Sequence, residues 1–189
     1  KEQKNYRAGL EYVNKSQAIR EKIGDRKGVA GSRNVRGLIF LLQKEYAKSL
    51  KEHEEALKIR ESIGHLEGIS ASIFNTSLVY EELNQIDKAL ELQVKTIEME
   101  SKVENKLSLA ISYNSISGLL IKAGRLKEVM PYLRKATELG ELTHSKLLKR
   151  NTALKYVDYY TAMKDYRKAL QYQQQYQLLN DSIYSEASA

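Results

Sequence analysis

The chain has 189 residues, enough for one or two domains of ordinary size. Its net charge is +7, from 31 basic and 24 acidic residues, and 42% of its residues are hydrophobic. These proportions are typical of a folded protein and exclude an intrinsically disordered tail. The chain has no cysteine, which excludes disulfides, thiolate zinc sites and thiol nucleophiles. Its single proline disfavours an all-β fold and favours long helices.

The sequence repeats with a period of 40 residues. Residues 19–28 and 59–68 are identical at six of ten positions. The same shift aligns a column of large residues, immediately preceded by a column of mostly small ones. The large column is Leu10, Leu50, Leu90, Met130 and Leu170, and the small column is Gly9, Ser49, Ala89, Val129 and Ala169. Each period contains two helical patterns of apolar residues, so we expect an all-α fold of antiparallel helical hairpins.

In chain order, residues 1–27 supply the second helix of a truncated unit, so we expect at least one more helix before residue 1 in a longer parent protein. Full units follow at 28–67, 68–107 and 108–147, and a last unit at 148–189. Together they make one domain, 1–189, of about nine helices. In the unit 68–107 the two helices run from about 69 to 83 and from about 87 to 103.

Several residues mark the predicted helix ends. The tight turns inside the hairpins fall at Lys44, Asn84, Gly124 and Lys164, of which only glycine is ideal. Gly24, Gly64 and Gly140 stand where helices could end, each supplying a left-handed residue. Pro131 falls near the start of a helix, and we expect it to distort the first turns.

No catalytic, cofactor-binding or metal-binding pattern is evident. His53, His65 and His144 are too far apart for a helical metal pair, and we expect them to be exposed. The basic cluster Lys146, Lys149 and Arg150 suggests nucleic acid, but acidic residues are interspersed nearly everywhere, so we expect no nucleic-acid partner. No apolar stretch is long enough to span a membrane. We therefore expect neither an enzyme nor a cofactor-binding protein.

The repeat resembles the tetratricopeptide repeat (TPR), in a form with a period of about 40 rather than 34 residues. Large residues recur near the end of the first helix, and small ones recur three positions earlier. The large residues are Phe40, Tyr80, Leu120 and Tyr160, and the small ones are Gly37, Ser77 and Ser117. The second helix begins with related segments at 46–50, 86–90 and 166–170. The resemblance covers essentially the whole chain and implies an α-solenoid, a TPR superhelix whose concave wall is lined by first helices.

This resemblance also implies a binding site for a protein or peptide segment in the concave groove. In relatives with 40-residue units, asparagines on this wall bind the backbone of an extended peptide. The corresponding residues here are Asn34, Asn75 and Asn114, with Leu38, Phe74 and Leu78 as apolar contacts and Glu81, Lys122 and Asp158 as charged ones. An equally open alternative is that the asparagines satisfy polar groups between helices. The Lys and Arg cluster of chaperone-binding relatives is not seen.

The segment 172–186 resembles the final repeat helix of bacterial sensor histidine kinases and related helix-turn-helix regulators. This implies a non-catalytic sensory region of a two-component signalling protein, in the periplasmic or extracytoplasmic part of an inner-membrane protein. The membrane would be contacted only by parts of the parent chain outside this sequence. A free-standing cytoplasmic adaptor and a peptide-sensing regulator are the alternatives, and a homodimer is left open.

Overall fold

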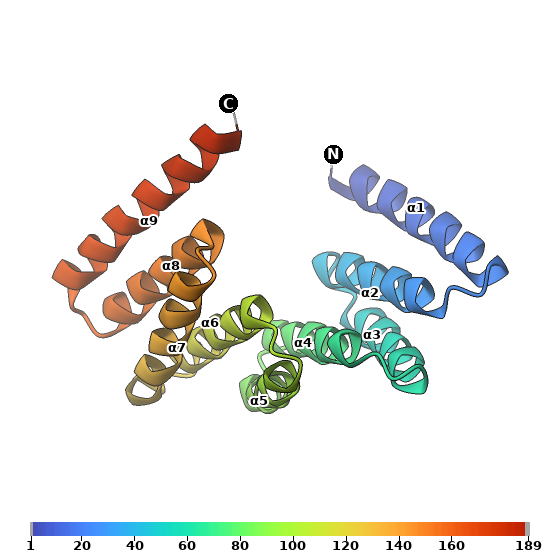
Figure 1. Cartoon of the computed structure of the whole chain (residues 1–189), viewed down its shortest axis with the longest axis horizontal. Helices are drawn as coiled ribbons and strands as arrows, with labels where there is room; N and C mark the ends of the chain where they lie inside the picture. Colours follow the sequence, from blue (N-terminus) through green and yellow to red (C-terminus); the bar gives the residue numbers. More distant parts are fainter. Residues whose placement is uncertain (1, 188–189) are drawn as a thin grey trace. The chain divides into compact units, whose positions relative to one another are not determined.

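The computed structural model describes residues 2–187, within which the chain forms nine α-helices, one 3₁₀ helix (η1) and no strand (Figure 1). In order they are α1 (Glu2–Lys22), α2 (Arg26–Leu42), α3 (Tyr46–Ser62), α4 (Leu66–Glu82), α5 (Ile86–Lys102), α6 (Lys106–Lys122), η1 (Leu126–Glu128), α7 (Val129–Leu142), α8 (Lys146–Ala162) and α9 (Tyr166–Ala187). The predicted all-α fold of helical hairpins is confirmed. None of these helices combines the length and apolarity needed to cross a membrane.

The helices group into two compact units, Lys1–Met99 and Glu100–Ala189. In unit 1, α1 packs on α2, α2 on α3, and α3 on α4; in unit 2, α6 packs on α7, α7 on α8, and α8 on both α6 and α9. The first helix of each predicted repeat begins two residues before the predicted boundary, at Arg26, Leu66, Lys106 and Lys146. The grouping of 1–189 into one domain stays a prediction.

In each period the backbone adopts the left-handed conformation, with positive φ, at one residue in each of its two turns. Inside the hairpins these residues are Lys44, Asn84, Gly124 and Lys164, as the repeat predicts; between hairpins they are Gly24, Gly64, Glu104 and His144. The prediction that Gly140 ends a helix is wrong, because Gly140 is buried inside α7. A Cβ atom there would lie 3.5 Å from Cγ of Lys149, an ordinary van der Waals contact, so Gly140 faces α8.

The expected distortion at Pro131 is confirmed. The equivalent helices α3, α5 and α9 begin at Tyr46, Ile86 and Tyr166, whereas α7 begins three residues later in its period, at Val129. The 3₁₀ helix η1 occupies the missing turn. Proline has no backbone N–H to donate four residues back, and its ring crowds the carbonyl of that residue, Lys127.

The tightest helix contacts lie at the column of small residues. Ser49, Ala89, Val129 and Ala169 are all buried, and the first three are fully inaccessible. In the neighbouring large column Leu90 is buried, but Leu170 is 60% exposed. Small side chains therefore set the close approach of the helices, and the large column is covered only where further helices pack beside it.

Side-chain hydrogen bonds join successive hairpins at a third column of the repeat, which contains residues 20, 60 and 100. The Nη1 atom of Arg60 donates to the Gly68 carbonyl at 2.8 Å and to Ser72 Oγ at 2.7 Å. Arg20 makes the equivalent contacts one period earlier. Glu100 replaces the arginine in unit 2 and accepts from Ser112 Oγ at 2.8 Å. At position 20 of the period, Arg20, Arg60 and Glu100 thus each fasten a second helix to the first helix that follows it. In α7 this position is Gly140, which has no side chain to make such a link.

Candidate functional site

The predicted groove residues all lie on the first helices of the hairpins. In unit 1, α2 carries Asn34 and Leu38, and α4 carries Phe74, Asn75, Leu78 and Glu81. In unit 2, α6 carries Asn114 and Lys122, and α8 carries Asp158. Leu38, Phe74, Asn75, Leu78, Glu81 and Asp158 are half-buried, and Lys122 is exposed.

Asn34 lies inside a polar network of unit 1. Its side chain is only 7% exposed. The amide nitrogen donates to Nδ1 of His53 at 3.0 Å, while the oxygen accepts from Nη1 of Arg60 at 2.6 Å and from Nδ2 of Asn75 at 3.2 Å. The structure thus brings Asn34 and Asn75 together, but the Asn34 amide is used within the fold and does not lie open as we predicted.

Asn114 is in the same situation in unit 2. It is also 7% exposed, and its Nδ2 donates to Oγ1 of Thr152 at 2.9 Å, which joins α6 to α8. Its buried Oδ1 has no hydrogen-bond partner within residues 2–187. Both residues therefore act between helices, and of the three predicted amides Asn75 is the one that reaches the surface.

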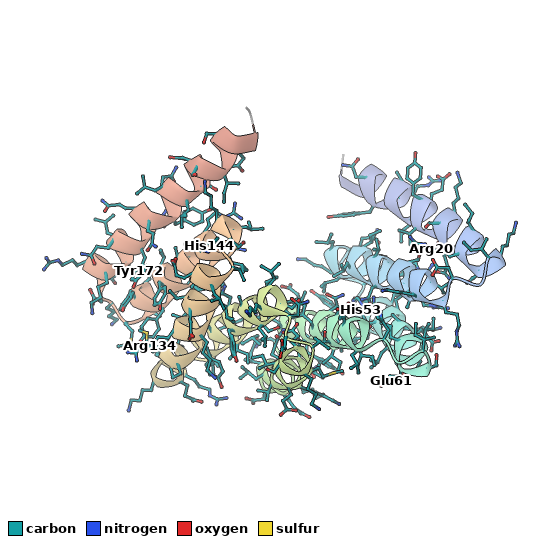
Figure 2. The ribbon with its side chains drawn as sticks, viewed as in Figure 1. Arg20, His53, Glu61, Arg134, His144 and Tyr172 are labelled. Atoms are coloured by element: carbon teal, nitrogen blue, oxygen red, sulfur yellow. The ribbon has the colours of Figure 1, made fainter. Side chains whose placement is uncertain are left out.

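His53 is not exposed as we expected. It is fully buried on α3 (Figure 2), opposite Gly37 of α2, where a Cβ atom would come within 2.6 Å of its Cε1. Burial, reinforced by the charge of Arg60, lowers the pKa of His53 to about 4. The histidine is thus neutral at pH 7, and the small residue predicted at position 37 is what makes room for its ring.

The first helices also expose large apolar residues outside the predicted set of groove residues. In unit 1 these are Val35, Leu42 and Leu66; in unit 2 they are Leu107, Ile111, Leu147 and Leu154. We call the exposed surfaces of α2 and α4 the first-helix face of unit 1, and those of α6 and α8 the first-helix face of unit 2. A sequence signal for them was the pair Leu107 and Leu147, which lie one period apart.

The first helices also carry most of the net charge. In unit 2, α6 has two lysines and no acidic residue, and α8 has four basic residues and one aspartate, so this pair has a net charge of +5. The second helices α7 and α9 each have two basic and two acidic residues. In unit 1, α2 is +4 and α4 is −3. The four first helices together therefore have a net charge of +6, and the net charge of the whole chain is +7.

No group of three or more potential metal ligands occurs in the part of the chain that the structure describes. Buried ionisable groups are present, but they contact structural partners. Glu100, like His53, is a buried ionisable group. Burial raises its pKa to about 7, and the hydrogen bond from Ser112 offsets part of this rise.

Comparison with known proteins agrees with this geometry. Residues 28–102 match the sequence model of the tetratricopeptide repeat. No curated protein matches the chain. Among solved structures, BtubC (BKLC) from P. vanneervenii has a TM-score of 0.72 at 15% identity, covering 94% of this chain and 82% of that one.

Two further solved structures are also similar. A signal-transduction ATPase with a tetratricopeptide repeat sensor, from Pyrococcus horikoshii, has a TM-score of 0.74 at 19% identity over 96% of this chain and 29% of that one. A Rap protein in complex with the competence and sporulation factor has a TM-score of 0.66 at 9% identity, over 93% and 59%. The chain therefore has a fold like that of tetratricopeptide-repeat proteins, and residues 28–102 match the sequence pattern of that family.

Proposed function

We propose that this chain is a non-catalytic module that binds a polypeptide segment along its first-helix faces. The observation that carries the proposal is the placement of Leu107, Ile111, Leu147 and Leu154 in unit 2, all large, apolar and exposed on first helices. Exposed apolar side chains gathered on adjacent helices mark surfaces that proteins use to bind partners. The match to the tetratricopeptide repeat, an interaction fold, supports this assignment.

The charge of these faces indicates the chemistry of the segment. The net +5 of α6 and α8 favours a segment that carries acidic side chains beside apolar ones. In unit 1, Asn75 offers its amide to a peptide backbone, flanked by the half-buried Leu38 and Leu78. Glu81 of α4 and Asp158 of α8 then select against acidic side chains at their own positions, while Lys122 favours them.

We further propose that the parent protein is a bacterial two-component signalling protein, with this chain as its extracytoplasmic sensory region. The resemblance of the segment 172–186 to the last repeat helix of sensor histidine kinases supports this reading, and so does the length of α9, which has 22 residues against 17 for most other helices. A free-standing cytoplasmic adaptor or a peptide-sensing regulator is the alternative. The gene sequence on both sides separates them: a signal peptide before and a membrane span with a kinase domain after would establish the sensor.

Binding to the first-helix face is tested with matched variants. A partner is isolated by pull-down, and its affinity is measured by calorimetry for Ile111→Ser on α6 and Val94→Ser on α5. Both residues are 45% exposed, so neither change disturbs the core, but only Ile111 lies on a first helix. We expect the Ile111 variant to lose about tenfold or more in affinity, as for loss of a buried apolar contact, and the Val94 variant to bind normally.

The same measurement of affinity is repeated in unit 1, with Asn75→Ala on α4 as the test variant and Lys95→Ala on α5 as its control. Removing the amide of Asn75 leaves a peptide group unpaired, which costs about 1–3 kcal/mol of binding. Affinity should also fall with added salt, since the attraction between an acidic segment and a basic face is screened. Equal affinities for all four variants, or binding that is insensitive to salt, would contradict the proposal.

A further inference from the structure

A cavity lies between α7, α8 and α9 of unit 2. Its volume is about 160 Å³. The residues that matter to the argument come from all three helices: Thr137 and Glu141 from α7, Lys149, Ala153 and Tyr156 from α8, and Tyr172 from α9. Tyr172 points toward α8 (Figure 2), and its ring stacks on that of Tyr156 with centroids 4.3 Å apart.

The cavity exists because this repeat departs from the pattern of the equivalent hairpins. Two periods of the repeat are 80 residues. The residues of unit 1 that correspond to Thr137, Lys149 and Ala153 are therefore Leu57, Ile69 and Ile73. Those three residues are all large and apolar; Ile73 is only 5% exposed, and Leu57 and Ile69 are half-buried. Replacing large apolar side chains by smaller or polar ones costs packing energy, so the hollow is not a contribution to stability.

The lining carries one charge of each sign. Nζ of Lys149 lies 2.5 Å from Oε2 of Glu141, and their side chains are 25% and 64% exposed. Behind this pair, Thr137 Oγ1 and the Tyr156 hydroxyl lie 3.3 Å apart, and Ala153 leaves an apolar floor beside the tyrosine rings. In the free protein Lys149 and Glu141 neutralise each other. A ligand with one charge that draws one of them away leaves the other without its counter-charge, whereas a ligand with both charges replaces the pair by two new ones.

The size of the cavity limits the ligand. Its volume of about 160 Å³ is well below the usual range of roughly 300–1,000 Å³ for drug-sized ligands. We propose that this cavity binds a small zwitterion, a free α-amino acid with a short side chain. Its carboxylate pairs with Lys149, its ammonium group pairs with Glu141, and its side chain lies on Ala153 and the tyrosine rings near the Thr137 hydroxyl.

The test is calorimetry on the full chain with glycine, alanine and serine at millimolar concentration, against propionate and propylamine as probes that carry only one of the charges. We expect at least one amino acid to bind and both single-charge probes to bind about tenfold or more weakly, since each lacks one charge-assisted contact. The proposal would be overturned if none of the three amino acids bound. It would also be overturned if propionate or propylamine bound as tightly as the amino acids.

Three variants locate the site. Glu141→Gln and Lys149→Met each remove one charge, and Ala153→Ile fills the cavity with the residue that the equivalent hairpin carries. Each should lose about tenfold or more in amino-acid affinity, whereas Glu138→Gln, an exposed residue on the same helix, should not. Unchanged binding by Ala153→Ile or by Glu141→Gln would refute the site. Since Glu141 is largely exposed, that variant decides the matter even if Ala153→Ile folds poorly.

Discussion

His53 illustrates how one residue on α3 depends on another on α2. The ring fits because position 37 is glycine. In the next hairpin the equivalent pair is Ser77 and Gln93, where Nε2 of Gln93 donates to Oγ of Ser77. In unit 2 it is Ser117 and Leu133, both fully buried. A small residue on the first helix thus accepts whichever large residue faces it, so this column tolerates chemically different pairs.

The buried His53 predicts a stability that falls in acid. Unfolded His53 takes up a proton near pH 6.5, whereas the folded residue does so near pH 4. The contribution of His53 to the free energy of unfolding should therefore decrease by at most about 3 kcal/mol as pH falls from 6.5 to 4. The free energy of unfolding of His53→Gln and of the wild-type protein is measured by denaturation from pH 4 to 8. The variant should not show the decrease in acid that His53 causes in the wild-type protein. His144→Gln, in an exposed turn, is the control; a shared pH dependence of both variants and the wild type would contradict the prediction.

Glu100 predicts the opposite slope. Burial raises its pKa from 4.5 to about 7, so the folded state holds a proton that the unfolded state releases. Its contribution is therefore present below pH 4.5 and is lost as pH rises to about 7, again by at most about 3 kcal/mol. Glu100→Gln should be more stable than the wild type at pH 8 and show no advantage at pH 4. The exposed Glu98→Gln is the control, and an equal gain there would reject the assignment.

At the scale of helices, the starts of α2, α6 and α8 share one device. The side chains of Asp25, Asn105 and Ser145 accept from the backbone N–H three residues later. Such caps satisfy a donor that the helix itself leaves unpaired. His65 takes this position before α4 and makes no such hydrogen bond, although its ring packs against Gly68 at the same turn.

Pro131 predicts where α7 starts. With Pro131→Ala, a backbone N–H becomes available to the Lys127 carbonyl, so α7 should extend back toward Leu126, where its counterparts begin. We expect the amides of residues 129–131 to gain protection in hydrogen exchange, with a stability change below about 1 kcal/mol, because proline also restricts the unfolded chain. Met130→Ala keeps the proline and should leave η1 in place. Retention of η1 in Pro131→Ala would show that tertiary contacts fix it.

At the scale of the whole molecule, a repeat stack should respond unevenly to a local defect, because each hairpin contacts mainly its neighbours. Leu90→Ala opens a cavity in unit 1 and should lower the free energy of unfolding by about 2–5 kcal/mol. Leu170→Ala changes the same column where it is 60% exposed, and should cost less than about 0.5 kcal/mol.

Hydrogen exchange distinguishes the response of the two units. In Leu90→Ala, protection should decrease more in Lys1–Met99 than in Glu100–Ala189. An equal decrease in both would mean that the chain unfolds as one cooperative body, and an unchanged denaturation midpoint would mean that Leu90 contributes little to the core.

The sequence by itself determined the helices and their pairing, because a 40-residue period with two apolar patterns leaves few other arrangements. It also located the turns at Lys44, Asn84 and Lys164 and the distortion at Pro131, since backbone conformation at these points depends on local residues.

Only the tertiary structure decided which polar residues are buried. Asn34 and Asn114 lie on the predicted helices, but whether their amides face a groove or a neighbouring helix depends on the rotation and spacing of the packed helices, which the period does not fix. For the same reason His53 is buried. The cavity beside Ala153 likewise required the packing of three helices, because a small residue leaves space only where its neighbours are held apart.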